Sequence, residues 1–158
     1  MENGSNPILL YDGVCGLCNR LVQFVLRHDG HGFFRFAALQ SSFAGQILER
    51  NGRHANELDT FYVVVDPNRP SERLLDRSDA MAFVLTELGG IWRTLALTWK
   101  IFPRRLRDAI YNLLAANRYQ WFGKLPACPI PGQSERERFL DVEADVARTP
   151  FNHPTREI

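Results

Sequence analysis

Apolar and polar positions divide the first ninety residues into short strands and amphipathic helices. "PILLY" (7–11) and "TFYVVVD" (60–66) are apolar runs that end in turn residues, which is typical of buried strands. "FFRFAAL" (33–39) alternates and is rich in aromatic residues, so it predicts a further strand. "ERLLD" (72–76) is predicted to form a hairpin with residues 60–66.

Helical spacing of apolar residues fills the intervals between these strands. A first helix is predicted to begin at Cys15 and to stop near Gly30. Residues 41–52 and 77–90 each have a serine placed to cap the first turn and a glycine at the end, which predicts two more helices. The resulting order, β-α-β-α-β-β-α, favours the α/β fold class, with one mixed sheet and helices on its faces.

The remainder of the chain is predicted to be largely helical. Apolar residues recur in steps of three and four up to Pro103, and a second helix with apolar residues on most of its circumference follows from about Arg104. Such coverage predicts a helix that packs against the domain on several sides. A short helix is expected over residues 136–147. We therefore expect a flexible N-terminus, a core, a C-terminal helical extension packed on that core and a tail, at residues 1–6, 7–90, 91–147 and 148–158.

Basic residues cluster in the predicted helical extension. Residues 100–124 contain six lysines and arginines against Asp108 alone. We interpret the stretch 91–107 as a core-packing helix with a basic outer face. The alternative is an interfacial helix, in which Trp92, Trp99 and the neighbouring basic residues rest on an anionic membrane surface.

Composition indicates a soluble globular protein. Of 158 residues, 45% are hydrophobic and 23% are charged, and the net charge of +1 gives no sign of a nucleic-acid partner. The N-terminus lacks the basic and apolar regions of a secretory signal, and no apolar run reaches the roughly 18–20 residues that span a bilayer. The three cysteines, an odd number, argue against a secreted disulfide scaffold. We therefore expect a cytoplasmic location.

Two of the cysteines, Cys15 and Cys18, lie in "YDGVCGLCN", where a predicted strand meets a predicted helix. Residues at this spacing on a helix have Cα atoms roughly 5–6 Å apart, which is within disulfide range. Unpaired backbone N–H groups and the helix dipole favour the thiolate of Cys15 at the helix start. Cys18, one turn further and less exposed, would resolve a mixed disulfide formed at Cys15. The pattern predicts dithiol–disulfide exchange, with Cys15 as the nucleophile and Cys18 as the resolving thiol.

Other interpretations of the cysteine pair stay open. The thiols could be structural, in a non-enzymatic module that binds a partner, or they could hold a metal. A zinc site needs four ligands, and the only other cysteine is Cys128. The histidines show no partner spacing, so no metal site is predicted. Cys128 is either a third redox thiol or a buried apolar residue, and we favour the second interpretation.

Three residues near the pair in sequence or in the expected fold are candidate accessory groups. Asp12, three positions before Cys15, could accept a proton from Cys18, or could serve only in the Asp-Gly turn. Arg118 could pair with Asp12 or stabilise the thiolate, although an ion pair elsewhere is the simpler interpretation. Tyr11 either lines a substrate groove or packs in the core.

The motif "YDGVCGLCN", with "RSDA" (77–80), "IFPRRLRDAIYNLLAANRYQWFGK" (101–124) and the later Cys128, resembles the DCC family of predicted thiol–disulfide oxidoreductases. That family takes its name from the arrangement D-x-x-C-x-x-C, which the motif contains. The resemblance covers roughly residues 7–140. It implies a thioredoxin-like domain with additional C-terminal helices.

The same resemblance implies where a substrate groove would lie and which partners to expect. Thioredoxin-like enzymes usually place a cis-proline just before the third strand, facing the dithiol. Here that place falls in "ELDTFYV", which has no proline, so Leu58, Asp59 or Thr60 is expected to line the groove. The expected partner is a disulfide-containing protein or a small thiol. No dissociable cofactor is required, because the electrons sit on the two sulfurs, and an external reductant must recycle them.

Overall fold

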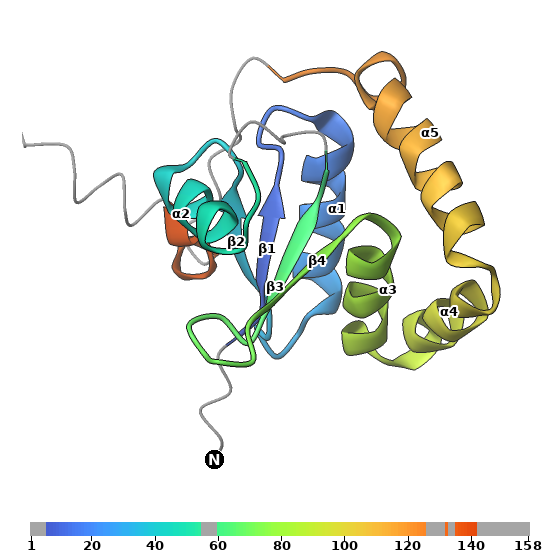
Figure 1. The fold of residues 1–158 in the computed structure, drawn as a ribbon, viewed down its shortest axis with the longest axis horizontal. Helices are drawn as coiled ribbons and strands as arrows, with labels where there is room; N and C mark the ends of the chain where they lie inside the picture. Colours follow the sequence, from blue (N-terminus) through green and yellow to red (C-terminus); the bar gives the residue numbers. More distant parts are fainter. Residues whose placement is uncertain (1–5, 55–59, 126–131, 133–134, 142–158) are drawn as a thin grey trace, which may run out of the picture.

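The computed structural model describes residues 6–54, 60–125, 132 and 135–141 and has a mixed α/β architecture (Figure 1). Its elements in chain order are β1 (Ile8–Tyr11), α1 (Gly16–His28), β2 (Arg35–Ala38), α2 (Ser42–Arg50), β3 (Tyr62–Val65), β4 (Arg73–Asp76), α3 (Arg77–Leu88), α4 (Gly90–Ile101), α5 (Arg104–Phe122) and a 3-10 turn (Arg136–Arg138). The predicted order β-α-β-α-β-β-α is confirmed, and the fold is consistent with a thioredoxin-like α/β architecture followed by further helices.

The described strands form one mixed sheet in the order β2-β1-β3-β4. β1 pairs with β2 in parallel and with β3 in antiparallel fashion, and β3 and β4 form the predicted hairpin. β1 therefore lies inside the sheet, and the cysteine motif follows directly from its C-terminal end at Tyr11. The C-terminal end of β2 lies beside it, because the two strands run in the same direction.

Both faces of the sheet are covered, which explains why its two central strands, β1 and β3, are continuous apolar runs in the sequence. Leu9 and Tyr11 of β1 pack in the core with α1 and α3, whereas Ile8 and Leu10 pack with α2. This division follows from the alternation of side chains along a strand. The core thus holds β1 from both sides and fixes the position at which α1 begins.

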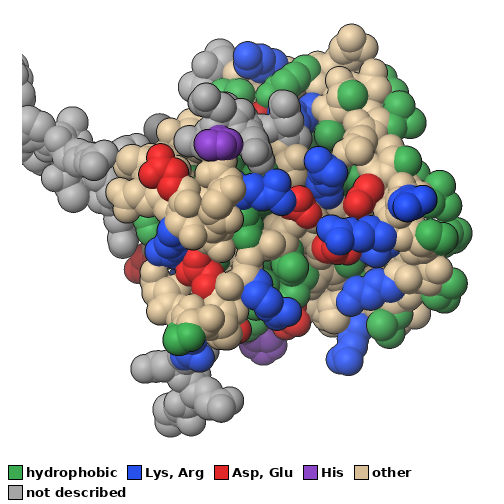
Figure 2. All heavy atoms as spheres, in the orientation of Figure 1, with side chains coloured by type: hydrophobic (Ala, Val, Ile, Leu, Met, Phe, Trp, Pro, Cys, Tyr) green, Lys and Arg blue, Asp and Glu red, His purple; other side chains and the backbone are tan. Residues whose placement is uncertain are grey.

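The last two long helices differ from the prediction. Figure 1 shows α4 and α5 at the edge of the molecule farthest from α2. Of the residues of α4, all of which the structure describes, only Ala96 is buried, and in the equally well described α5 only Arg107 and Arg118 are buried. The prediction of a helix packed on several sides is wrong, because α5 rests on α1 and α3 along one face. Figure 2 shows hydrophobic side chains along the outer edge over these helices.

After α5 the chain returns to the sheet. Phe139 is buried in the core beside α1 and α3, where its ring stacks on Phe36 with 5.1 Å between centroids. The helix predicted over 136–147 begins in the described residues as a 3-10 turn, and its part beyond Asp141 lies outside them. The bounds given above for the N-terminus, core, extension and tail stay predictions.

Candidate active site

The cysteine pair occupies the first turn of α1. Cys15 is the N-cap residue, with an extended backbone (φ −83°, ψ 122°), and its Sγ accepts a hydrogen bond from the Cys18 backbone N–H at 3.4 Å. A thiol thus stands where a serine or aspartate usually caps a helix, among the unpaired N–H groups of the first turn. Both cysteines are free thiols. The predicted start of the helix at Cys15 is confirmed.

The two thiols differ in their affinity for a proton. The hydrogen bond that the Cys18 side chain donates lowers the pKa of Cys15 to about 6, despite the opposing effect of burial. Backbone N–H groups of Cys18 and Leu17 lower this pKa further, as does the positive charge of Arg118. The same side-chain hydrogen bond, together with burial, raises the pKa of Cys18 well above its ordinary value. At neutral pH the proton therefore stays on Cys18 and the negative charge on Cys15.

The chain that follows α5 crosses the first turn of α1. The Gly16 N–H donates to the Gly123 carbonyl at 3.1 Å, and the Leu125 N–H donates to the Val14 carbonyl at 2.7 Å. Residues 123–125, here named the covering segment, thus form an antiparallel bridge with the backbone of the cysteine motif. Main-chain groups alone make these bonds, so they leave no side-chain pattern in the sequence.

The covering segment determines which thiol is accessible. Cys15 is fully buried, whereas Cys18 is half-buried and lines a cavity. The backbone at the end of α5 lies so close to the first turn of α1 that a Cβ on Gly16 would lie 2.2 Å from the Phe122 carbonyl oxygen. The prediction that Cys15 is the more exposed thiol is therefore wrong. The covering segment pairs with the backbone on both sides of Cys15 and leaves the thiol buried.

A buried carboxylate lies beside the motif. Asp12 Oδ1 accepts hydrogen bonds from the Val14 N–H at 3.1 Å and from Gln40 Nε2 at 2.7 Å. Asp12 Oδ2 accepts from Arg118 Nη2 at 3.4 Å and from the Tyr119 hydroxyl. Asp12 and Arg118 are both buried, so little solvent screens the ion pair between them. Asp12 therefore shapes the turn and pairs with Arg118, while its role in proton transfer stays a prediction.

The sequence does not single out two members of this cluster, Gln40 and Tyr119. Gln40 lies just beyond β2, and the parallel pairing of β1 with β2 brings it to the same edge of the sheet as Asp12. A prediction of that pairing would have indicated Gln40. Tyr119 adjoins Arg118 on α5, and only the fold shows that its hydroxyl reaches Asp12 while the guanidinium lies 4.6 Å from its ring centroid.

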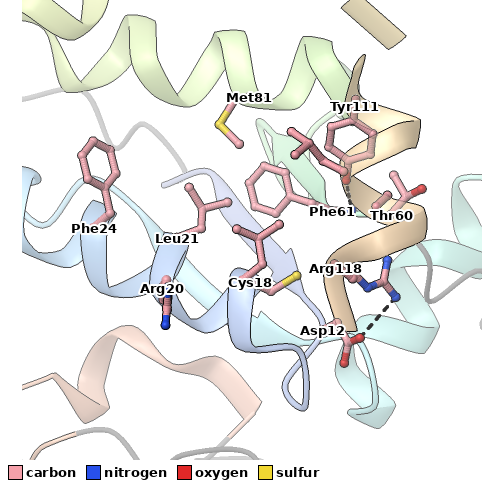
Figure 3. A pocket seen from close by; sticks show the side chains of 13 residues that line it. Asp12, Cys18, Arg20, Leu21, Phe24, Thr60, Phe61, Met81, Tyr111 and Arg118 are labelled. Carbon is pink, nitrogen blue, oxygen red and sulfur yellow. Dashed lines mark hydrogen bonds and ion pairs between the residues drawn. The ribbon is translucent and has the colours of Figure 1, made fainter. Parts of the chain in front are cut away.

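A cavity of about 320 Å³ opens beside Cys18. It lies between α1, α3 and α5, and its walls are mostly apolar (Figure 3). Asp12, Cys18 and Arg118 meet at one end, where Figure 3 shows the Cys18 sulfur on the same side as the guanidinium. The apolar walls include Leu21, Phe24, Phe61, Met81 and Leu114. A cavity of this size and polarity can accept an apolar side chain or a small apolar molecule.

The other predicted site residues lie in different places relative to the cavity. Thr60 lines the cavity, whereas Leu58, Asp59 and Cys128 lie outside the described residues. Tyr11 is buried in the core beside α1 and α3, so it does not line a groove. In the described part of the chain there is no cis peptide bond and no cluster of three potential metal ligands.

A family model described as DCC1-like thiol-disulfide oxidoreductase matches residues 9–124, a span that contains Asp12, Cys15, Cys18 and Arg118. The chain belongs to this family. The family resemblance predicted from the motif is thereby confirmed, and membership of the DCC1-like family supports a redox role for the protein.

Two relatives match most of the chain. The Bacillus subtilis (strain 168) protein named "Uncharacterized protein YuxK" is 37% identical over 139 residues, which make up 88% of this chain and 97% of that protein. A chloroplastic "DCC family protein" of Arabidopsis thaliana is 33% identical over 129 residues, or 82% of this chain and 72% of that protein. No solved structure matches the chain significantly. In the residues that the structure describes, no helix has the length and hydrophobicity needed to cross a bilayer.

Proposed function

We propose that the protein is a thiol–disulfide oxidoreductase that exchanges disulfides through Cys15 and Cys18. The observation that carries the proposal is the thiol pair itself. Cys15 caps α1, accepts hydrogen bonds from Cys18 and has a pKa lowered to about 6. A thiolate is the attacking species in disulfide exchange, so Cys15 is in the reactive protonation state at neutral pH. Membership of the DCC1-like family supports the same class of reaction.

The exchange takes two steps. First, the Cys15 thiolate attacks one sulfur of a substrate disulfide, and the other substrate sulfur leaves as a thiolate. Then Cys18 gives up its proton and attacks the Cys15 sulfur, which releases the second substrate thiolate. The substrate gains two electrons, and Cys15 and Cys18 become a disulfide. An external thiol reductant returns the two electrons, and the cytoplasm, the location we propose, maintains such reductants.

The second step needs a proton acceptor for Cys18, whose pKa is raised in the dithiol state. Asp12 is the candidate acceptor, because its carboxylate and the Cys18 sulfur lie at the same end of the cavity (Figure 3). Forming the mixed disulfide also removes the negative charge of Cys15, which is one of the causes of the high Cys18 pKa. The first step therefore makes Cys18 easier to deprotonate in the second.

Substrate access requires movement of the covering segment, because it closes off Cys15. When the segment moves, the Val14 carbonyl and the Gly16 N–H become available for bonding. An extended substrate chain can occupy both groups in the same antiparallel manner. The apolar cavity beside Cys18 then accepts an apolar side chain of the substrate near its disulfide.

Trapping the intermediate tests the proposal. Full-length Cys18→Ser is expected to form a lasting mixed disulfide at Cys15 with an aromatic disulfide probe, because no resolving thiol remains. The wild type should instead release the whole probe and end as the Cys15–Cys18 disulfide, and Cys15→Ser should do neither. Intact-mass spectrometry distinguishes these products, with Cys128→Ser as the control that keeps both reactions. A mixed disulfide that forms on Cys18 rather than Cys15 would reverse the assigned roles.

The full burial of Cys15 favours a second candidate function, a non-enzymatic module that binds a partner and has structural thiols. Alkylation of the native protein before and after mild oxidation separates the two. An oxidoreductase loses two alkylation sites on oxidation and regains them on reduction. Structural thiols resist alkylation in both states until the protein is unfolded.

A further inference from the structure

The outer faces of α4 and α5 carry large apolar side chains that the fold leaves in solvent. Ile91 and Ile101 of α4 are 70% and 80% exposed, and Leu113 and Trp121 of α5 are 58% and 55% exposed. Isolated exposed apolar residues are ordinary, but a contiguous set on neighbouring helices marks a binding surface. Figure 2 shows hydrophobic side chains along one edge of the molecule, over the position of α4 and α5 in Figure 1.

Helix geometry aligns these residues on a common side of each helix. Ile91 and Ile101 lie five positions before and after Ala96, the buried residue of α4, so each is about 140° around the helix from it. On α5, Leu106, Ile110 and Leu113 follow in steps of four and three and form a single stripe. Trp121 lies eleven residues, or about three turns, after Ile110 and continues that stripe. We name these apolar side chains of α4 and α5 the outer face.

The charges on α4 and α5 are mostly basic. Residues 90–122 contain six basic side chains and one acidic side chain, Asp108, which pairs with Arg104. Arg93, Lys100 and Arg105 are exposed, and none of them forms an ion pair with another residue that the structure describes. Arg93 and Lys100 are seven residues apart, about two turns, and thus lie on one side of α4. Basic side chains therefore border the apolar ones, as Figure 2 also shows.

We propose that the outer face docks on an anionic lipid surface, with α4 and α5 lying in the plane of the interface. Exposed leucine, isoleucine and tryptophan side chains bordered by lysine and arginine are what such a surface binds, through apolar burial and attraction to lipid phosphates. Trp121 is of the residue type that prefers the boundary between headgroups and hydrocarbon. A second copy of the chain is a poorer occupant, because a twofold contact through this face would bring the basic borders of the two copies close together.

Flotation of the full-length reduced protein with vesicles tests this proposal. Protein is expected to float with vesicles of phosphatidylcholine and phosphatidylserine, to float much less with phosphatidylcholine alone, and to be released at high salt. Arg93→Glu with Lys100→Glu should weaken binding by at least about fivefold for each basic group lost, the effect of one charge near an anionic surface. Arg27→Glu with Arg73→Glu, two exposed residues outside the outer face, is the control with the same change in net charge.

The apolar contribution is tested separately with Ile91→Gln and Ile101→Gln in one protein. Both side chains are exposed, so thermal unfolding should be unchanged while flotation is lost. Wild-type protein that does not float, or that floats equally with neutral vesicles, would overturn the proposal. A dimer in sedimentation velocity that the double glutamine variant abolishes, without any flotation, would overturn it in favour of a second copy of the chain.

Discussion

Arg118 on α5 forms a buried ion pair with Asp12, which lies 106 residues earlier in the chain, with 3.4 Å between Nη2 and Oδ2. This contact joins the C-terminal helices to the turn that carries the cysteine motif. It also places a positive charge where it favours the Cys15 thiolate and lowers the pKa of that thiol. Helix α5 therefore belongs to the candidate active site as well as to the surface.

Arg118→Met should destabilise the protein strongly. The substitution leaves the Asp12 carboxylate buried without its cationic partner, which typically costs about 3–5 kcal/mol. Arg104→Met is the matched control, because Arg104 is an arginine of the same helix whose ion pairs with Asp79 and Asp108 lie at the surface. Its loss should cost no more than about 1 kcal/mol. Urea unfolding of the two reduced variants measures the difference, and equal midpoints would show that the buried pair adds nothing.

Asp12→Asn should slow the second step of exchange more than the first. Asparagine keeps an oxygen for the Val14 N–H but cannot take a proton from Cys18. Stopped-flow measurement with an aromatic disulfide probe separates attack at Cys15 from release by Cys18, through the two bursts of probe thiolate. Some stability should be lost with the Arg118 pair, so the rates are measured well below the unfolding midpoint. If both bursts keep their wild-type rates, Asp12 serves only the turn and the ion pair.

The reactivity of Cys15 should follow a pKa of about 6 rather than the ordinary value of 9.0. In Cys18→Ala, which has no side-chain donor and so loses the strongest cause of this shift, the midpoint should move upward. The pH dependence of iodoacetamide labelling, read at Cys15 by peptide mass spectrometry, reports both midpoints. Coincident profiles for wild type and Cys18→Ala would mean that the hydrogen bond between the thiols does not set the pKa of Cys15.

The stability of the reduced protein should also depend on pH, and the sign follows from the same pKa. Between about pH 6 and pH 9 the folded Cys15 is a thiolate while the unfolded thiol holds its proton, so stability rises with pH in that interval. Below the folded pKa both states are protonated and the contribution of Cys15 disappears. Cys15→Ser has no such group and should show a flatter profile over this interval. Urea unfolding of the two proteins under reductant, repeated from pH 5 to pH 9, provides the comparison.

Gly16→Ala should uncover Cys15. The new methyl group would lie 2.2 Å from the Phe122 carbonyl oxygen, so the backbone leading into the covering segment must move away. Labelling of Cys15 should become faster and the melting temperature should fall. Gly45→Ala is the control, because Gly45 lies inside α2 with nothing within 4 Å of the added carbon. That change should stabilise the protein by about 0.5–1 kcal/mol and leave labelling unchanged.

The parts of this fold that the sequence predicts are those set by local pattern. β1, the turn at Asp12 and the start of α1 at Cys15 follow from an apolar run, a turn dipeptide and helical spacing within a few residues. For Arg118 the sequence favours an ion pair elsewhere over one with Asp12, and this is wrong, because nothing local shows which carboxylate a helix 106 residues away will meet. The covering segment is held by backbone bonds, which any sequence can make.

The error about α5 has a different physical cause. The apolar periodicity of α5 predicts burial of its apolar residues, yet the buried residues of this helix are Arg107 and Arg118, while Leu106 and Leu113 face solvent. Burial of an arginine is tolerated where a carboxylate pairs with it, as Asp79 does with Arg107. A hydrophobicity pattern alone cannot show that arginines are buried while leucines are exposed. It assigns each side chain a hydrophobicity by itself and does not include the carboxylate with which an arginine pairs.

The last turns of α5 and the covering segment are consecutive in the chain, so one short stretch contacts both Asp12 and the cysteine motif. Residues 118 and 119 neutralise and hydrogen-bond Asp12, and residues 123–125 close over Cys15. Under the proposed function, a substrate that displaces the covering segment would also displace the helical turn that holds the Asp12 carboxylate. In the proposed exchange, access to the Cys15 sulfur is therefore coupled to the ion pair and the hydrogen bond that hold Asp12.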